Sequence, residues 1–421
     1  MVHQTINTSR NIATPASRIN SHILILMFST RRSLPVSLGI VAWLVSACTT
    51  TPPAPPVTTM PPPVGPVAVP APPTPLMTPT TFGALPGWQQ DNLREAWPAF
   101  TASCKVLVRK DDWKAPCSMA ASVNPADGAA IRVFFETFFV PNQVRAPDGA
   151  DTGLITGYYE PMLRGVRQRG GAFQTPLYRV PDDLLTIELA SVYPELKGMR
   201  LRGRLVGKKI VPYFTRAEIE RADIQGKELL WVDDPVEAFF LEVQGSGRVQ
   251  LADTGETVRL AYADQNGHPY KAIGRWLVEQ GELPVAQVSA QSIKAWIAAH
   301  PARRQELFNA NPSYVFFREE RLPDASIGPK GALGVPLTPG RSVAIDPQLL
   351  PLGAPVYLAT TRAGSEAPLQ RLMVGQDTGG AIRGAVRADF FYGVGKEAAE
   401  SAGLMKQRGQ IWVLLPKAGA R

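Results

Sequence analysis

The segment from Gly375 to Gly393 constrains the fold more than any other part of this sequence. It reads GQDTGGAIRGAVRADFFYG, so two carboxylates, Asp377 and Asp389, stand twelve positions apart with glycines between them. Glycine permits positive φ and close approach of backbone, so this stretch can fold back and bring both acids into one pocket. When two carboxyl groups are held close together away from water, their pKa values move apart, so one of them can stay protonated near neutral pH. Cleavage of a glycosidic bond requires such a protonated acid. The alternative is that Asp377 caps a turn and Asp389 is a solvated surface acid.

The first 47 residues have the pattern of a secretory leader. They contain no Asp or Glu, Arg31 and Arg32 precede an apolar run at 34–45, and small residues lead to Cys48. The run is too short to span a bilayer comfortably. Met27 is a natural start for such a leader, so residues 1–26 could lie upstream of the true start.

The end of this leader resembles the lipobox of bacterial lipoproteins. The resemblance implies cleavage before Cys48 and lipidation of its sulfur. Thr49 follows, and the Asp that often retains lipoproteins at the inner membrane is absent. We therefore expect an outer-membrane lipoprotein that faces the periplasm; an uncleaved anchor with an incidental cysteine is the alternative.

Residues 48–80 are expected to form a lipidated, proline-rich linker. Thirteen prolines lie among Ala, Val and Thr between residues 52 and 79, a composition that favours extended polyproline and buries no core. At about 3.1 Å per residue this stretch reaches on the order of 90 Å. Such a tether would let an anchored enzyme reach a target away from the membrane, although a featureless spacer has the same composition.

Composition limits the partners and cofactors. The formal charge is +8, and the four leader arginines account for half of it, so nucleic acid is not expected as a partner. Cys104 and Cys117 could pair across a short loop in an oxidising compartment. No group of residues has the spacing of a zinc site, and we expect neither metal nor cofactor.

Hydrophobic periodicity predicts a mainly β protein with helices at its edges. A capping box at Thr215–Glu218 opens one short helix. Further helices are expected over 89–104, 129–139, 269–280, 292–300 and 396–405. Strands are expected over 154–159, 202–213, 228–232, 238–243, 313–318, 341–345, 355–358, 372–376 and 411–415. Closely spaced short strands with Gly/Pro turns favour a barrel over a parallel βαβ sheet.

Three further clusters carry polar groups suited to a sugar polymer. Thr156 and Tyr158 lie in TGYYEP, where hydroxyls and aromatic faces could contact sugar rings, or could mark a half-buried strand end. Gln244 and Ser246 lie in QGSG, which follows an expected strand. This motif is either a binding turn or a plain hairpin turn with Asp233 as its surface cap. Asp346 lies in AIDP and could be a simple turn residue.

Together these motifs resemble the membrane-bound lytic murein transglycosylase A family. The segments around Asp346, Asp377 and Asp389 look like its "three-aspartate" domain, and TGYYEP and FFLEVQGSG match in order. The resemblance covers roughly residues 150–416. It implies a barwin-like double-psi β-barrel, residues 81–161 and 312–416, interrupted by an inserted β-rich substrate-binding domain, residues 162–311. A glycan strand would lie in the groove between them.

The resemblance also implies a reaction in cell-wall turnover and remodelling. The β-1,4 bond between N-acetylmuramic acid and N-acetylglucosamine is cleaved without water, which leaves 1,6-anhydro ends. Asp389 matches the catalytic acid, and Asp377 matches a neighbour that raises its pKa and orients it. The expected substrate-binding residues are Thr156, Tyr158, Gln244, Ser246 and Asp346, the last with a structural role favoured.

Two other functions fit the same residues. An inverting hydrolase would use Asp389 as acid and Asp377 or Asp346 as the base on water. A barwin-like wall-binding protein would bind polysaccharide without cutting it. The expected partners are peptidoglycan glycan strands, the outer membrane through the lipid anchor, and a wall-remodelling protein complex.

Overall fold

The computed structural model describes residues 76–417 except 223, 225 and 323. The expectations for the leader, for lipidation of Cys48 and for most of the proline-rich segment lie outside the described residues. Within the described part, no helix combines the length and the apolar character needed to cross a bilayer.

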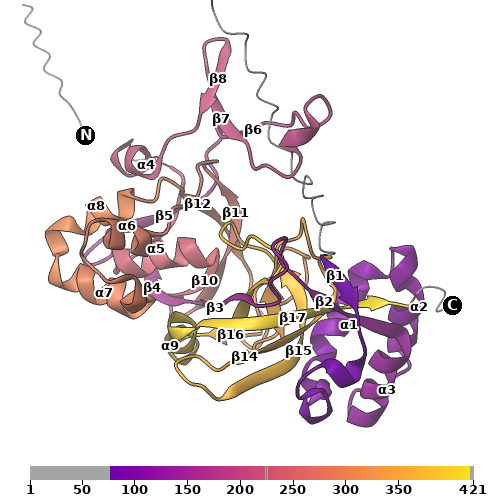
Figure 1. The fold of residues 1–421 in the computed structure, drawn as a ribbon. Coiled ribbons are helices and arrows are strands. Elements are labelled where there is room, and N and C mark those ends of the chain that lie inside the picture. The colour runs from indigo at the N-terminus through magenta and orange to yellow at the C-terminus, as the bar shows by residue number, and fades with distance from the viewer. Residues whose placement is uncertain (1–75, 223, 225, 323, 418–421) are drawn as a thin grey trace, which may run out of the picture. The chain divides into compact units, whose positions relative to one another are not determined.

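Six strands close into a barrel (Figure 1). The chain of pairings β3–β16–β13–β15–β14–β17 is closed by a further pairing of β17 with β3. The pairs β3–β16 and β13–β15 are parallel, and the others are antiparallel. Buried Val343, Val374, Phe390 and Val413 belong to the main core cluster, which fills this region. The barrel strands are β3 (Gly153–Glu160), β13 (Ser342–Ala344), β14 (Pro355–Thr361), β15 (Pro368–Asp377), β16 (Arg387–Val394) and β17 (Lys406–Pro416).

Two more strands extend this sheet beyond the barrel. β2 (Phe139–Val144) pairs with β17, and β1 (Met77–Pro79) pairs with β2 as an edge strand. The linker was expected to run to residue 80, and this boundary is wrong at its end. An edge strand tolerates Pro79, so a proline-rich composition did not exclude pairing there.

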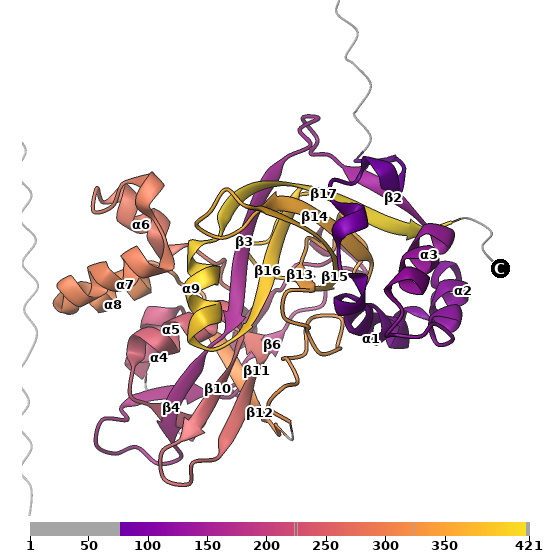
Figure 2. The same ribbon diagram turned by 90° about the horizontal axis from the view of Figure 1, so that it is seen from below.

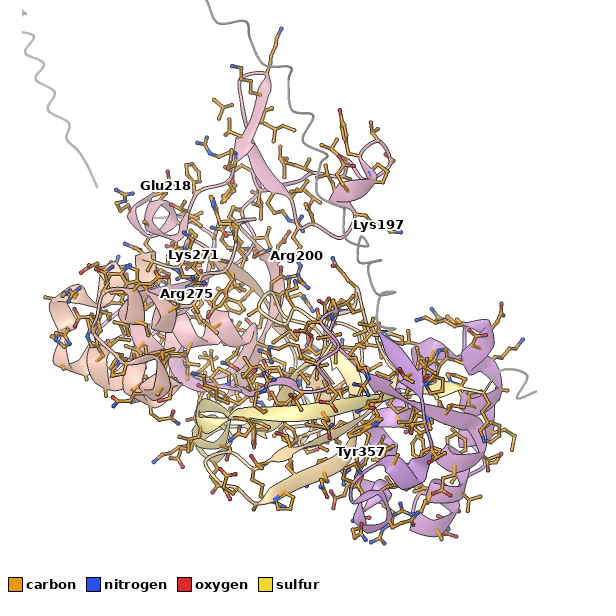
Figure 3. All side chains as sticks on the ribbon, viewed as in Figure 1. Lys197, Arg200, Glu218, Lys271, Arg275 and Tyr357 are labelled. Atoms are coloured by element: carbon orange, nitrogen blue, oxygen red, sulfur yellow. A yellow bond between two sulfur atoms is a disulfide. The ribbon has the colours of Figure 1, made fainter. Side chains whose placement is uncertain are left out.

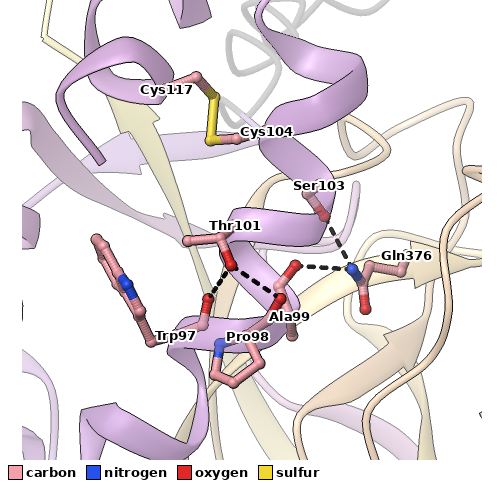
Figure 4. Close-up of a disulfide and its surroundings, with 8 residues drawn as sticks. All are labelled: Trp97, Pro98, Ala99, Thr101, Ser103, Cys104, Cys117 and Gln376. Carbon is pink, nitrogen blue, oxygen red and sulfur yellow. Dashed lines mark hydrogen bonds between the residues drawn. A yellow bond between two sulfur atoms is a disulfide. The ribbon is translucent and has the colours of Figure 1, made fainter. Parts of the chain in front are cut away.

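Three helices pack against one end of the barrel: α1 (Trp97–Leu107), α2 (Asp111–Ala120) and α3 (Gly128–Phe138), preceded by the 3₁₀ turns η1 (Phe82–Ala84), η2 (Trp88–Gln90) and η3 (Leu93–Glu95). The helix expected over 89–104 starts at Trp97 instead, with Pro98 in its first turn, where proline is tolerated. Buried Phe100 and Phe135 contact each other edge to face at 5.1 Å between ring centroids. Figure 4 shows the Cys104–Cys117 disulfide that joins α1 to α2, with 5.1 Å between the Cα atoms.

A second sheet is inserted between β3 and β13. Its strand order is β12–β11–β10–β4–β9–β5, and it follows β3 directly along the chain. The insert was expected to end at Asn311, but β12 pairs with β11, so this sheet continues to Glu320. Its strands are β4 (Met162–Val166), β5 (Thr175–Tyr178), β9 (Glu228–Val232), β10 (Ser246–Leu251), β11 (Thr257–Gln265) and β12 (Val315–Glu320). A separate three-stranded sheet comprises β6 (Leu185–Thr186), β7 (Arg202–Val206) and β8 (Lys209–Pro212), with the turn η4 (Pro194–Leu196) between β6 and β7.

Most remaining helices belong to the inserted region: α4 (Arg216–Ala222), α5 (Pro235–Gln244), α6 (Ile273–Glu279), α7 (Ala290–Ala299) and α8 (Arg304–Asn309), with 3₁₀ turns η5 (Val285–Gln287) and η6 (Pro301–Arg303). α9 (Lys396–Leu404) packs on β3 and β16 (Figure 2). Gly157 of β3 allows this contact, because a Cβ there would lie 3.0 Å from the Cα of Ala402. The mainly β fold class with helices at its edges is confirmed.

The strand expected over 238–243 is wrong, because this segment belongs to helix α5. The Asp234 side chain caps the helix by accepting from the backbone N–H groups of Val236 and Glu237. Gly245 ends it in the left-handed region, with φ 81°. The QGSG motif therefore joins a helix to β10 and is not a hairpin turn.

Candidate active site

The two carboxylates of the glycine-rich segment lie on strands that flank β13. Asp377 ends β15, Asp389 lies in β16, and both are register partners of Ala344. One intervening strand places their Cα atoms roughly 10 Å apart. The segment 378–386 thus folds back as its glycines allow and brings both acids to one region of the barrel wall. Both side chains are partly buried and keep some contact with solvent.

β3 contributes two hydroxyls, one to each acid. Thr156 and Tyr158 stand two residues apart and so lie on the same face of the strand. Thr156 Oγ1 donates to Asp389 Oδ1 at 2.5 Å, and Tyr158 Oη donates to Asp377 Oδ2 at 3.0 Å. Four of the expected site residues therefore form two hydrogen-bonded pairs, each made of a β3 hydroxyl and one of the acids.

Asp377 is held as an acceptor on both oxygens. Its Oδ1 accepts from the backbone N–H groups of Ala332 and Thr378, each at 2.9 Å, and its Oδ2 accepts from Tyr158. Burial nevertheless raises the pKa of Asp377 to about 6, against the effect of these donors, and the charge of Asp389 adds a smaller increase. The hydrogen bonds fix the orientation of this carboxylate, and they favour its ionised form.

Asp389 has a sparser set of partners. Among the described residues, Thr156 is its hydrogen-bond donor, which leaves Oδ2 with no protein partner. Burial raises the pKa of Asp389, while Arg387 and the Thr156 hydroxyl lower it. The sequence-based expectation gave Asp377 as the cause of a raised pKa at Asp389; burial is the cause in the structure.

Tyr158 stays a proton donor throughout the neutral range. Burial raises the pKa of its phenol well above the ordinary value, and the charges of Asp377 and Asp389 raise it further. Its ring lies 5.1 Å from the ring of Phe391, measured between centroids. Its main observed contact is to Asp377.

A loop between β12 and β13 supplies the Ala332 donor. Leu333 N–H donates to the Gln376 carbonyl at 3.0 Å, so the loop lies directly against the end of β15. Gly331 permits this approach, because a Cβ there would lie 2.6 Å from the same carbonyl oxygen. On the inner side, Gln376 Nε2 donates to the Ala99 carbonyl and to Ser103 of α1 (Figure 4), which fixes the strand that carries Asp377.

A buried ion-pair triad anchors the same loop, and the sequence reasoning named none of its members as site residues. Glu160, fully buried, accepts from Arg248 at 2.9 Å and from Arg259 at 2.7 Å. Both arginines also donate to the carbonyl of Ile327. The triad therefore joins the end of β3 to β10, β11 and the loop. These residues are 88 and 99 positions from Glu160, so no local pattern could have paired them.

The remaining expected residues have different surroundings. Gln244 Oε1 accepts from the Tyr159 backbone N–H at 3.0 Å, which ties α5 to β3. Ser246 is partly buried at the start of β10, beside this contact. Asp346 is 3% exposed and accepts from the backbone N–H groups of Gly384 and Gln348, so it braces the segment 378–386 from inside. This position matches a structural role better than contact with substrate.

One further residue near the acids comes from the inserted region. Tyr270, which is 38% exposed, lies in the segment between β11 and α6. Burial of its phenol raises its pKa, and Asp389 contributes to that increase, so the two groups are within electrostatic reach. Tyr270 is therefore the residue of the inserted region that we relate to Asp389.

The chain is similar to known protein families along most of its described length. Residues 154–318 match the model of the MltA specific insert domain, and residues 341–415 match the model of the 3D domain. The membrane-bound lytic murein transglycosylase A of Escherichia coli (strain K12) is 33% identical over 285 residues, which is 66% of this chain and 70% of that protein.

Solved structures agree with this assignment. The membrane-bound lytic murein transglycosylase of Agrobacterium tumefaciens is 31% identical and has a TM-score of 0.72, covering 81% of this chain and 97% of that one. The E. coli MltA structure with bound chitohexaose is 28% identical and has a TM-score of 0.59, covering 82% and 92%. The chain therefore belongs to the membrane-bound lytic murein transglycosylase A family.

Proposed function

We propose that this protein is a peptidoglycan lytic transglycosylase that cleaves the β-1,4 bond between N-acetylmuramic acid and N-acetylglucosamine. One observation carries the proposal: Asp389 Oδ2 has no partner among the described residues, while the neighbouring Asp377 accepts three hydrogen bonds. An acid that donates a proton needs a free oxygen, and a carboxylate that orients the site needs fixed donors. Family membership and the chitohexaose complex of the E. coli relative support a β-1,4-linked amino-sugar polymer as the substrate.

In this mechanism Asp389 is the acid and then the base. Protonated Asp389 gives its proton to the glycosidic oxygen as the bond from that oxygen to C1 of the muramic residue breaks. The C6 hydroxyl of the same residue attacks C1, and its proton passes to the Asp389 carboxylate. The product is a 1,6-anhydro ring and a free 4-hydroxyl, with no water added. The nucleophile is part of the substrate, so one acid/base residue suffices.

Asp377 and Tyr158 serve the same step without exchanging protons with the sugar. Ionised Asp377 would stabilise positive charge that develops at C1. Tyr158 holds Asp377 in place and remains protonated. A bound glycan would remove the remaining water from Asp389, which raises its pKa further and keeps it protonated until the bond breaks.

The position of the protein in the cell follows from the proposed lipid anchor. Lipidation of Cys48 would hold the chain at the outer membrane, and the proline-rich segment would let the barrel reach the wall from the periplasmic side. The glycan would pass between the barrel and the inserted region, near Thr156, Gln244, Ser246 and Tyr270. A wall-remodelling complex would bring this activity to sites of growth.

Product analysis of digested sacculi tests the reaction. Mass spectrometry of fragments from wild-type protein should detect anhydro-terminated muropeptides, and Asp389→Ala should release none while still binding glycan. Reducing ends would instead indicate an inverting hydrolase. Intact glycan with retained binding would indicate a non-catalytic wall-binding protein.

A further inference from the structure

The segment 187–212, here called the arm, exposes an unusual share of apolar surface. It contains η4 and the hairpin of β7 and β8, and in Figure 1 this hairpin points away from the barrel strands. Sixteen large hydrophobic side chains are exposed in the described part of the chain, and seven of them lie in these 26 residues. They are Leu189, Val192, Tyr193, Met199, Leu205, Val206 and Ile210, with exposed fractions from 41% to 68%. Exposed apolar side chains gathered in this way mark an interaction surface.

The arm is also strongly basic. It has two acidic residues, Glu188 and Glu195, against six basic ones. Among the described residues, Arg202 is the one of these six that forms an ion pair, with Asp264 at 2.9 Å. Figure 3 shows Lys197 and Arg200 on this part of the molecule. The basic residues are Lys197, Arg200, Arg202, Arg204, Lys208 and Lys209.

Apolar and cationic side chains both lie at the hairpin tip. Leu205 and Ile210 are register partners, so their side chains share a face, and both are more than half exposed. The next pair is Val206 with Lys209, and the turn between them carries Lys208. A protein interface would deplete charged residues at its apolar centre. Here the two register pairs that flank Leu205 and Ile210 each carry a cation, Arg204 opposite Val211 and Lys209 opposite Val206, on the other face of the hairpin.

We propose that the arm docks on an anionic phospholipid bilayer. Aliphatic and aromatic side chains of this size bury at the boundary between headgroups and acyl chains, and lysine and arginine pair with lipid phosphates. A lipid anchor holds a protein more firmly when a second membrane signal accompanies it. The arm provides such a signal through its own charges and apolar tips, whether or not Cys48 carries a lipid. It goes beyond the proposed cleavage reaction and does not depend on it.

Vesicle co-sedimentation of the full chain carrying Cys48→Ala tests the proposal without the anchor. Vesicles containing phosphatidylglycerol should bind this protein, and pure phosphatidylcholine vesicles should bind it much less. Each lysine near the surface contributes roughly fivefold to partitioning, so Lys208→Glu with Lys209→Glu should weaken binding by about 25-fold or more. Leu205→Ser with Ile210→Ser should also weaken it, and about 0.5 M salt should reduce the charge-dependent part.

Matched variants elsewhere on the surface provide the controls. Arg275→Glu with Lys396→Glu removes two cations whose side chains are 81% and 90% exposed, and Val133→Ser with Met119→Ser removes two exposed apolar groups. These variants should bind vesicles as the parent does, and every variant should still cleave isolated sacculi, which shows that it is folded. Equal loss of binding in arm and control variants would overturn the proposal. Absence of vesicle binding by the parent would also overturn it. Arm variants that bind vesicles as the parent does but no longer bind sacculi would overturn it as well, because the arm would then bind the wall polymer.

Discussion

Replacing Asp377 by asparagine should stabilise the protein at neutral pH. The amide oxygen would remain an acceptor for the N–H groups of Ala332 and Thr378, and the amide nitrogen would face the Tyr158 hydroxyl, which can accept as well as donate. The substitution therefore removes a buried charge and preserves the hydrogen-bond geometry. No cavity is created, because the side chains have nearly the same shape.

The size of the effect follows from the pKa of Asp377. Its folded-state value of about 6 lies above the ordinary 3.8, so the folded protein binds the proton more tightly than the unfolded chain does. Wild type therefore loses stability as pH rises through this window, and the loss is complete above about pH 6. A shift of about two units corresponds to roughly 3 kcal/mol, as an upper value. The asparagine variant has no such loss, so its advantage should be near zero below about pH 4 and largest at neutral pH.

Urea unfolding of both proteins between about pH 4 and pH 7.5 measures this difference. Asp253→Asn, at an exposed turn between β10 and β11, is the matched control. Its difference in unfolding free energy from wild type should not increase with pH. A difference that is constant across the pH range, or a variant that is less stable at neutral pH, would refute the burial argument. The pH–rate profile should change as well, because the acid limb near a pH of about 6 should be lost.

Four other substitutions test separate parts of the account. Glu160→Gln leaves two buried arginines without their carboxylate and should cost about 3–5 kcal/mol in urea unfolding; a loss below about 1 kcal/mol would contradict the anchoring role of the triad. Thr156→Val removes the donor to Asp389, so the basic limb of the pH–rate profile should move to higher pH, and an unmoved limb would exclude Asp389 as the titrating acid. Cys117→Ser removes a disulfide whose cysteines are 13 residues apart, and should lower the free energy of unfolding by about 3 kcal/mol under oxidising conditions. Once wild type is reduced, the two proteins should be equally stable. Cys48→Ala should let a high-salt wash release the protein from membranes while it still cuts isolated sacculi; unchanged retention would contradict the lipid anchor.

The sequence predicted most strands of the barrel and the meeting of its two central acids. Alternating apolar residues and Gly/Pro turns carry that information locally, and the glycines between Asp377 and Asp389 indicate the return of the chain. The barrel closure itself has no local signal, because β3 pairs with strands more than two hundred residues later. Thr156 and Asp389 are likewise 233 positions apart in the sequence, which explains why their hydrogen bond could not be foreseen.

The main error arose where an apolar run fits two kinds of structure. Residues 238–243 were expected to form a strand, since a short apolar run does not separate strand from helix. The deciding signals flank the run: Asp234 and Pro235 at a helix start, and Gly245 at its end. Asp346 was named with the substrate-binding residues, with a structural role favoured, and only the structure reveals that its carboxylate accepts from backbone N–H groups in the interior.

The role of Asp389 can be measured most directly from the products of isolated sacculi. Wild type and Asp389→Ala are incubated with sacculi at equal amounts, and the soluble muropeptides are separated and weighed by mass spectrometry. The account predicts fragments with 1,6-anhydro ends from wild type, and glycan binding without release from the variant. Anhydro products from Asp389→Ala at a rate near wild type would contradict it.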